Sequence, residues 1–303
     1  MKRVVLPRLA TVILLSALGL GGCVRYEQGD AAFQAGDYPT AYARWQLLAK
    51  FGDARAQNEL GWLYQSGLGT DLDPAQAAHW YRRAATQGLA VAQTNLGILY
   101  NDGKGVTRDP REAARWFELA ARQGDAAALN NLGVLYDRGD GVPEDHQRAA
   151  QLLRQAADKG HPRAMSNLGL LYKNGEGVPQ DAATAVRWFR AAAAAGDREG
   201  QNNLAVMLDN GLGAAADPAA ARQLFERAAR AGEAGAAVNL ALMLLRPGKE
   251  ATAEARLAAY AWLNVAASQG HEQAATMRSN LALLLTPEEV ALAQARSLTL
   301  LAP

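Results

Sequence analysis

The 303-residue sequence contains one cysteine, four histidines and eleven prolines, and its formal charge is only +1. A single cysteine excludes an intramolecular disulfide, so packing alone must hold the fold together. The nearly balanced charge includes no basic stripe, which argues against a nucleic-acid partner. Aromatic residues make up 7% of the chain, whereas alanine-rich runs such as 191–195 occur in it. This composition favours closely packed helices over a β core of large aromatic residues.

Motifs of catalysis and metal binding are also missing. The histidines at His79, His146, His161 and His271 form no ligand pair such as His-x3-His. No Gly-x-Ser-x-Gly nucleophile elbow occurs. The Gly-x-Gly pairs of the chain precede no Lys-Ser/Thr, so they are not phosphate-binding loops. We therefore expect a protein that is not an enzyme and holds neither a cofactor nor a metal.

Residues 1–22 have the pattern of an export signal. A positive segment that includes Lys2 and Arg8 precedes an uncharged apolar run over 9–20. This run is too short for a permanent membrane-spanning helix, and it has the length of the apolar part of a secretory signal. The sequence therefore predicts export.

The apolar run ends in Leu20-Gly21-Gly22-Cys23, which resembles the lipobox of bacterial lipoproteins. In that family the cysteine receives a diacylglycerol and becomes the mature N-terminus. The resemblance implies lipidation of Cys23, and acyl chains such as palmitate anchor a protein without a membrane-spanning helix. Val24 is not the Asp of the inner-membrane retention signal, which implies an outer-membrane lipoprotein facing the periplasm or the cell surface. The alternative is an ordinary signal peptide in which Cys23 is incidental.

A 36-residue repeat fills most of the remaining chain, as a search for self-similarity reveals. Its clearest mark is a Leu-Gly or Leu-Ala pair at Leu60-Gly61, Leu96-Gly97, Leu132-Gly133, Leu168-Gly169, Leu204-Ala205 and Leu240-Ala241. A Gly-x-Gly pair, an aspartate and a further single glycine recur at the same step. The last unit is longer, since Gly270 follows Gly232 by 38 positions.

Each repeat is predicted to be a helical hairpin. The first helix covers about 53–66, where Leu60 and Tyr64 share one face. The Gly-x-Gly pair supplies positive φ for a helix stop and a tight connection. The second helix begins at Asp73 as N-cap with Pro74 at its first position, and it runs to the single glycine.

The Gly of the Leu-Gly pair stands in the middle of a helix, where it costs about 1 kcal/mol relative to Ala. Because two repeats replace it with Ala, the position requires a small residue rather than an unusual φ. We expect the Ala84-Ala85 pair of the second helix to face Gly61. The tryptophans of the second helix are predicted to belong to the core of each repeat: Trp80, Trp116 and Trp188.

The pattern Ala-x3-Leu-Gly-x-Leu-Tyr-x2-Gly-x-Gly, followed by Asp, Trp-Phe and Ala-Ala, resembles the Sel1-like repeat, a relative of the tetratricopeptide repeat with a longer loop. The resemblance implies an all-α fold, a right-handed α-solenoid of antiparallel helix pairs. We expect a signal peptide at 1–22, a lipidated N-terminus with a divergent first hairpin at 23–52, six repeats at 53–270 and capping helices at 271–303. Thr286 to Glu289 form a capping box that predicts the start of the last helix.

If the first helices line the concave surface, as in relatives of this repeat, positions 55, 58, 59, 62, 65 and 66 and their equivalents are exposed. At position 59 the first repeat has Glu59 and the others have Asn95, Asn131, Asn167, Asn203 and Asn239. In tetratricopeptide proteins such an Asn often binds the backbone of an extended peptide, because an amide both donates and accepts hydrogen bonds. The resemblance thus implies a partner-binding ladder. The alternative is that each Asn bonds the neighbouring repeat and only locks the stack.

Beside this asparagine ladder runs an apolar row formed by Trp62, Ile98, Val134, Leu170, Val206 and Leu242. We expect most of the row to pack between adjacent first helices. Trp62 lies near one end of the array, where its ring could stack on a ligand.

Together these features predict a non-enzymatic, lipid-anchored scaffold of the bacterial cell envelope that binds protein partners through the concave face. The resemblance to lipoproteins with this repeat implies a role in envelope assembly, exopolysaccharide export or host contact. The alternative is a lipoprotein that binds polysaccharide or peptidoglycan through exposed aromatic residues such as Trp62.

Overall fold

The computed structural model describes residues 26–246 and 252–301, and within these ranges it contains sixteen α-helices and no strand. The expected all-α class is therefore confirmed. The chain divides into two compact units, Met1–Asp125 (unit 1) and Ala126–Pro303 (unit 2). The predicted signal peptide and the lipidation site Cys23 lie outside the described residues.

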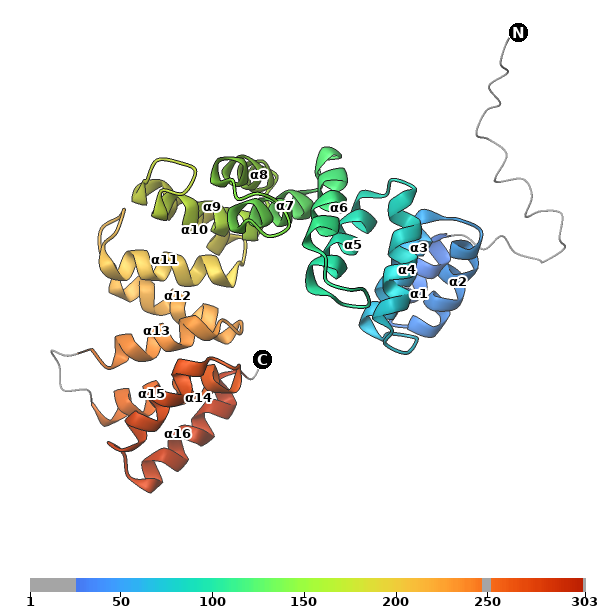
Figure 1. The fold of residues 1–303 in the computed structure, drawn as a ribbon. Coiled ribbons are helices and arrows are strands. Elements are labelled where there is room, and N and C mark those ends of the chain that lie inside the picture. The colour runs from blue at the N-terminus through green and yellow to red at the C-terminus, as the bar shows by residue number, and fades with distance from the viewer. Residues whose placement is uncertain (1–25, 247–251, 302–303) are drawn as a thin grey trace, which may run out of the picture. The chain divides into compact units, whose positions relative to one another are not determined.

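Unit 1 consists of three helix pairs, drawn from blue to green in Figure 1. The helices are α1 (Tyr26–Gln34), α2 (Tyr38–Lys50), α3 (Ala54–Ser66), α4 (Pro74–Thr86), α5 (Ala90–Asp102) and α6 (Pro110–Arg122). Each of the helices α1 to α5 packs against the one that follows it within this unit. The first pair, α1 and α2, is the divergent hairpin that precedes the 36-residue repeats.

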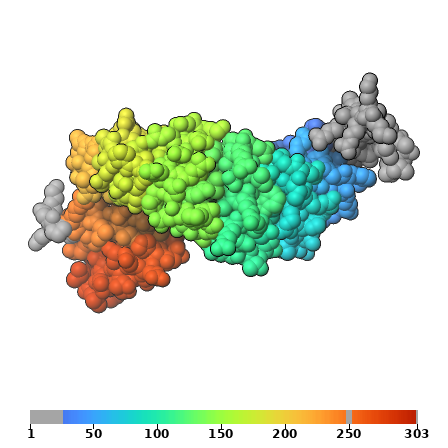
Figure 2. Space-filling view, turned by 45° about the horizontal axis from the view of Figure 1, so that its top comes forward, coloured from blue at the N-terminus to red at the C-terminus, as the bar shows by residue number. Residues whose placement is uncertain are grey.

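Unit 2 continues the same arrangement with four helix pairs and two further helices. Its helices are α7 (Ala126–Arg138), α8 (His146–Asp158), α9 (Pro162–Asn174), α10 (Ala182–Ala194), α11 (Arg198–Asn210), α12 (Pro218–Arg230), α13 (Ala234–Leu244), α14 (Ala253–Ser268), α15 (Glu272–Ala282) and α16 (Pro287–Leu300). In the space-filling view of Figure 2, consecutive repeats of this unit follow one another as contiguous bands of colour. At its end, α14 packs against α13, α15 and α16. We call the first helix of each repeat the A helix and the second the B helix.

The helices begin where the sequence places capping residues. The Oδ1 of Asp73 accepts from the backbone N–H groups of Ala75 and Gln76, both at 3.0 Å, and Pro74 stands at the first helical position. Such a cap satisfies backbone donors that the helix itself leaves unpaired. At the last helix, the capping box between Thr286 and Glu289 is present. These predictions of helix starts are confirmed.

The two glycines of each Gly-x-Gly pair have different tasks. Gly103 has φ +69° and ends α5 in the left-handed conformation. Gly105 also has positive φ, and a Cβ at this position would lie 2.1 Å from the carbonyl oxygen of Pro74 in the preceding repeat. The same contact recurs in unit 2 between Gly177 and His146. The second glycine is therefore required because the loop presses against the first turn of the preceding B helix.

The glycine of the Leu-Gly pair lies against an aromatic ring. A Cβ on Gly97 would lie 2.5 Å from Cε1 of Phe117, and one on Gly61 would lie 2.8 Å from the ring of Tyr81. The expectation that Ala84-Ala85 faces Gly61 is therefore wrong, because the ring one helical turn earlier occupies that space. The requirement for a small residue remains, since these glycines have no positive φ.

The B-helix tryptophans differ from one another in burial. The residue after each of them fills the core, since Tyr81, Phe117 and Phe189 are at most 2% exposed. Trp80 is 9% exposed and belongs to the core as predicted, but Trp116 and Trp188 are only half-buried. Trp116 packs against the core of unit 1 without being buried in it. Trp116 and Trp188 therefore lie at the margin of the core, because Phe117 and Phe189 take the buried position and the adjacent residue is turned by about 100° along the helix.

Candidate functional site

The A helices of unit 2 form a continuous surface, because α7 contacts α9, α9 contacts α11 and α11 contacts α13. We call it the A-helix surface. Four asparagines of the ladder lie on successive A helices of unit 2: Asn131 on α7, Asn167 on α9, Asn203 on α11 and Asn239 on α13. All four side chains are half-buried, as is Asn95 in unit 1.

Three of the five ladder asparagines bond the preceding repeat. The hydrogen bonds run from Nδ2 of Asn95 to Oδ1 of Asn58 at 3.1 Å, from Asn167 to Asn130 at 2.9 Å and from Asn239 to Asn202 at 2.9 Å. Each bond connects two adjacent A helices. The acceptors Asn58 and Asn130 are 5% and 3% exposed, so the expectation that position 58 faces the groove is wrong.

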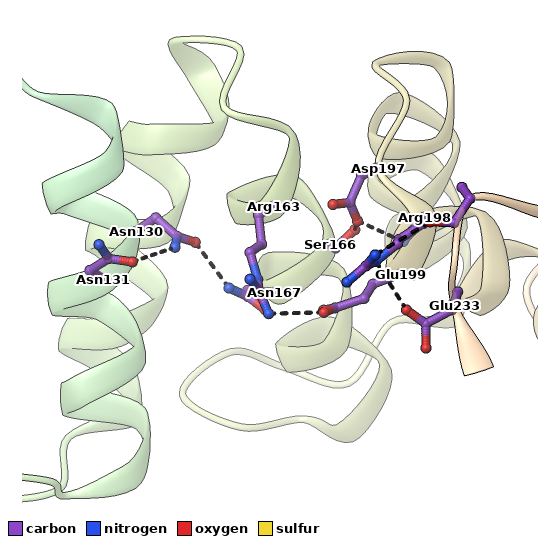
Figure 3. A network of polar contacts seen from close by, with 11 residues as sticks. Asn130, Asn131, Arg163, Ser166, Asn167, Asp197, Arg198, Glu199 and Glu233 are labelled. Atoms are coloured by element: carbon purple, nitrogen blue, oxygen red, sulfur yellow. Dashed lines mark hydrogen bonds and ion pairs between the residues drawn. The ribbon is translucent and has the colours of Figure 1, made fainter. Parts of the chain in front are cut away.

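Asn131 and Asn203 differ from the other three. The Oδ1 of Asn131 accepts from Nδ2 of its neighbour Asn130 at 3.2 Å, as Figure 3 shows. Opposite Asn203, the preceding repeat has Ser166 in place of an asparagine, and its hydroxyl donates to Asp197 at 2.5 Å. Within the described residues of unit 2, the Nδ2 of Asn131 and the whole amide of Asn203 have no hydrogen-bond partner.

Whether a ladder asparagine bonds the preceding repeat depends on the residue at position 58 or its equivalent in that repeat. The first five repeats have Asn58, Thr94, Asn130, Ser166 and Asn202 there, so that amides and hydroxyls alternate, and the sixth repeat has Val238. Each hydroxyl donates to the aspartate that precedes the next A helix, Thr94 to Asp125 at 3.1 Å and Ser166 to Asp197. Where the residue at position 58 is an amide, the last residue of the repeat is not an aspartate: it is Leu89, His161 or Glu233. The first five repeats thus alternate with a period of two units at this position.

This alternation was not predicted from the sequence, where position 58 was expected only to be exposed and position 59 alone to form a ladder. The signal was present one residue earlier, in the column that runs Asn, Thr, Asn, Ser, Asn. The hydroxyl oxygen of a serine or threonine can accept as well as donate. In this structure, however, Ser166 and Thr94 donate to their aspartates, and among the described residues of unit 2 Ser166 accepts no hydrogen bond from Asn203. The identity of residue 58 in each repeat therefore decides whether the next ladder amide is engaged.

Charged side chains connect neighbouring A helices at the border of the ladder. Figure 3 shows Arg163 paired with Glu199 at 2.9 Å and Arg198 paired with Glu233 at 3.5 Å. These arginines are more than half exposed, so each pair contributes little to stability. Their effect is to neutralise the carboxylates along this border.

The first position of the ladder carries a carboxyl group in place of an amide. Burial raises the pKa of Glu59, and its Oε1 accepts from Nδ2 of Asn58 at 3.1 Å. Asn95 donates to the same Asn58, so a short chain of hydrogen bonds ends on Glu59. In unit 2 the corresponding chain runs from Asn167 through Asn130 and ends on Asn131.

The apolar row beside the ladder is only partly covered. Ile98, Val134, Leu170 and Val206 are half-buried, whereas Leu242 at the far end is 48% exposed. Trp62 is 36% exposed, and its ring lies edge-on to Phe33 of α1 with 5.3 Å between the centroids. One side of this indole is therefore occupied by the chain itself.

The described residues contain neither a metal-binding cluster nor a membrane-spanning helix. No group of three His, Cys, Asp or Glu side chains in the described ranges could hold a metal ion. His161 and His271 accept from backbone N–H groups as N-caps of α9 and α15. None of the helices in 26–246 and 252–301 is both long and apolar enough to cross a bilayer.

The comparison with known protein families identifies the same repeating unit as the helix pairs. The family model of the Sel1 repeat matches six consecutive segments, at residues 54–89, 90–125, 126–161, 162–197, 198–233 and 234–271. Among curated proteins, none matches the sequence significantly.

Two crystal structures are similar over most of the chain. One is a Sel1 repeat protein from Oxalobacter formigenes, which is 31% identical with a TM-score of 0.72, covering 81% of this chain and 97% of that one. The other is a protective antigen present in uropathogenic Escherichia coli strains that displays an SLR fold, 31% identical with a TM-score of 0.64, covering 91% of this chain and 64% of that one. The helix pairs are thus those of the expected α-solenoid, and their scaffold is of a kind that in general serves protein–protein interaction without catalysis. The chain belongs to the Sel1 repeat family.

Proposed function

We propose that the protein is a non-enzymatic, lipid-anchored scaffold of the bacterial cell envelope that binds a protein partner through its A helices. The observation that carries the proposal is the pair of unused amides at Asn131 and Asn203 on the A-helix surface of unit 2. Polar groups that are fully buried normally have a hydrogen-bond partner. A protein that covers this surface would bury both amides and must therefore supply such partners. A partner that supplies backbone carbonyls would satisfy both.

The hydrogen bonds of Asn131 determine what it can offer. Its Oδ1 is occupied by Asn130, which leaves Nδ2 as a donor. A donor of this kind pairs with a peptide carbonyl whatever the partner's sequence. The half-buried Val134, Leu170 and Val206 beside it provide apolar area that side chains of an extended segment could cover. Within unit 2, Asn167 and Asn239 have the remaining hydrogen of Nδ2 and their Oδ1 for the same partner. Unit 1 by itself offers the same groups on Asn95, together with the exposed edge of Trp62.

Export and anchoring rest on the segment before the helices. The charged start, the apolar run and Cys23 support an outer-membrane lipoprotein, facing the periplasm or the cell surface. That a structural relative is a protective antigen supports exposure at the envelope. Envelope assembly, exopolysaccharide export and host contact are the contexts in which such a scaffold would act, and glycan is a further candidate partner.

Fractionation of cells tests the anchor. The wild type is expected in the outer-membrane fraction and labelled by a palmitate analogue, and Cys23→Ala should be unlabelled and released on lysis. A matched Cys23→Ser variant should behave like Cys23→Ala. Recovery of Cys23→Ala in the membrane fraction would contradict lipidation at this residue.

Site-specific photocrosslinking tests the surface. A photoreactive residue at Val134 should crosslink a defined envelope protein, and the same residue at the exposed Arg190 on α10 should not. The product should fall at least tenfold when Asn131→Ala and Asn203→Ala are combined, because both unused amides are then gone. Equal crosslinking from Arg190, or an unchanged yield in the double variant, would refute binding through this ladder.

A further inference from the structure

A second polar site lies away from the ladder, on the B-helix side of unit 2. It is a hollow of about 390 Å³ between α8, the end of α9 and α10. It is lined by Arg154, Tyr172, Thr184, Arg187, Trp188 and Ala191, and we call it the Arg154 pocket. Its volume lies in the range of small-molecule sites.

Two guanidinium groups line this pocket, and none of the residues that line it has a carboxylate. Arg154 stacks over the ring of Tyr172 at 5.5 Å from its centroid and donates to the phenol oxygen. Arg187 donates to Oγ1 of Thr184 at 2.7 Å. Among the described residues neither arginine has an ion-pair partner within 4 Å, and most of the five donors of each guanidinium remain unused. The hydrogen bonds from Thr184 and, to a smaller extent, the charge of Arg187 lower the pKa of the nearby Asp181 carboxyl, which forms no ion pair with Arg187 within 4 Å.

Trp188 provides the aromatic wall of the pocket. The core position of α10 belongs to Phe189, which is fully buried, and Trp188 is half-buried. An indole with an exposed part combines a large apolar face with a polar N–H, as at many binding surfaces. Its position beside two guanidinium groups suits a ligand that has both an apolar ring face and a negative charge.

A smaller hollow of about 240 Å³ adjoins the pocket and shares Arg154 with it. Gln147, Gln151 and Arg154 follow one another along α8 at spacings of four and three residues, so they lie on one face of the helix. Amide and guanidinium groups in a row offer planar donors and acceptors to hydroxyl groups. The site therefore extends beyond one ring.

The equivalent residues of unit 1 include a carboxylate that the Arg154 pocket of unit 2 lacks. Seventy-two residues earlier, Arg82 donates to the Tyr100 hydroxyl at 2.6 Å. There, however, Glu112 stands where unit 2 has Thr184, and it forms an ion pair with Arg115, the equivalent of Arg187. A role in joining repeats would explain both Arg–Tyr contacts. It does not explain why only unit 2 has replaced the carboxylate and kept the second arginine unpaired.

We propose that the Arg154 pocket binds an acidic saccharide, with a carboxylate on Arg154 and Arg187 and a sugar ring on Trp188. Guanidinium groups pair with carboxylates in a bidentate manner. Gln147 and Gln151 would bind hydroxyl groups of the next sugar. The site is independent of the asparagine ladder, so its failure would leave the proposed protein scaffold untouched.

Isothermal titration calorimetry of the full chain in detergent tests the site, with a tetramer of galacturonic acid as the probe. We expect saturable binding of this probe and none of maltotetraose, a neutral tetramer of the same length. Arg187→Gln and Trp188→Ala should each weaken binding at least tenfold. Thr184→Glu, which restores the carboxylate found in unit 1, should abolish it.

Controls separate the acidic saccharide from other anions. Arg115→Gln, the matched change in unit 1, should leave binding unchanged, and circular dichroism melting should confirm that all variants are folded. Equal binding of maltotetraose, equal binding of a tetraglutamate peptide, or binding of glucose 6-phosphate in place of the uronate would each overturn the proposal. So would the absence of heat with the uronate tetramer.

Discussion

Asn130 is 3% exposed, and its Oδ1 accepts the Nδ2 of Asn167 from the next repeat at 2.9 Å. Truncation of Asn167 would leave this buried carbonyl without that partner. A buried acceptor that loses its donor costs about 1–3 kcal/mol. We therefore expect Asn167→Ala to lower the free energy of unfolding by roughly that amount, measured by urea denaturation.

Asn203→Ala is the matched control, since Asn203 has the same position in its repeat and bonds no neighbouring repeat within the described residues. Its free energy of unfolding should stay within about 0.5 kcal/mol of the wild type. Equal losses in the two variants would mean that both side chains stabilise the stack in the same way, and the distinction between engaged and unused amides would fail.

His146 gives the fold a pH-dependent contact. Its Nδ1 lies 2.9 Å from Asp137 and its Nε2 lies 3.3 Å from Glu144. The hydrogen bond to Asp137, aided by Glu144 and Glu176, raises the pKa of His146. Because the folded pKa exceeds the unfolded one, the stabilisation is fully present below the unfolded value of about 6.5 and is lost as pH rises through the folded pKa.

The expected measurement compares wild type with His146→Gln in urea at pH 5.5 and pH 8.5. The wild type should be the more stable protein at pH 5.5, and the difference should shrink at pH 8.5. Because the His146 side chain is 35% exposed and its partners are also accessible to solvent, the effect should be small. A difference that grows with pH would show that the neutral imidazole makes the stabilising contact.

The loop between the A and B helices tests the two roles of glycine. Gly103 has positive φ, and an added Cβ there would lie 3.1 Å from Cβ of Arg108 and 3.4 Å from its backbone nitrogen, which is tight without being a severe overlap. Gly103→Ala should therefore cost about 1–2 kcal/mol, the penalty of the left-handed conformation. Gly105→Ala carries the same penalty and also places Cβ 2.1 Å from the Pro74 oxygen. It should destabilise the chain by several kcal/mol, and the thermal melting point should fall much further than for Gly103→Ala.

Equal melting points for the two variants would show that the loop can move away from the B helix of the preceding repeat. Gly103→Asn serves as a further control, because Asn tolerates positive φ better than Ala does. It should lie between wild type and Gly103→Ala.

The helix pairs could be predicted from the sequence because their start and stop signals are local. Asp73 and Pro74 begin a helix, and the glycines end one, whatever lies elsewhere in the chain. The orientation of Trp116 could not be predicted in the same way, since two adjacent aromatic residues compete for one core position and the packing of the next helix decides. The bond from Asn167 to Asn130 joins residues 37 positions apart, and a single column of asparagines does not specify its acceptor. Lipidation of Cys23 stays a prediction.

At the scale of the whole molecule, stability in such an array is a sum of contacts between neighbours. In unit 2, α16 closes the end of the stack, with Ala293 fully buried and Ser297 accepting from Asn264 of α14 at 2.8 Å. Deletion from Thr286 onward should therefore lower hydrogen-exchange protection in α13, α14 and α15. The helices α3 to α6 of unit 1 should keep theirs. Uniform loss of protection through the chain would mean that the array unfolds as one cooperative body.

The spacing of the two unused amides sets a minimum length for a partner that binds both. Asn131 lies on α7 and Asn203 on α11, with α9 between them. Packed helices are about 8–10 Å apart, so the two amides are separated by about 16–20 Å. An extended chain advances about 3.3 Å per residue, so about five or six residues of a partner would bridge them. A shorter peptide could reach only one amide, and the scaffold would thereby discriminate between ligands by length even where their sequences are alike.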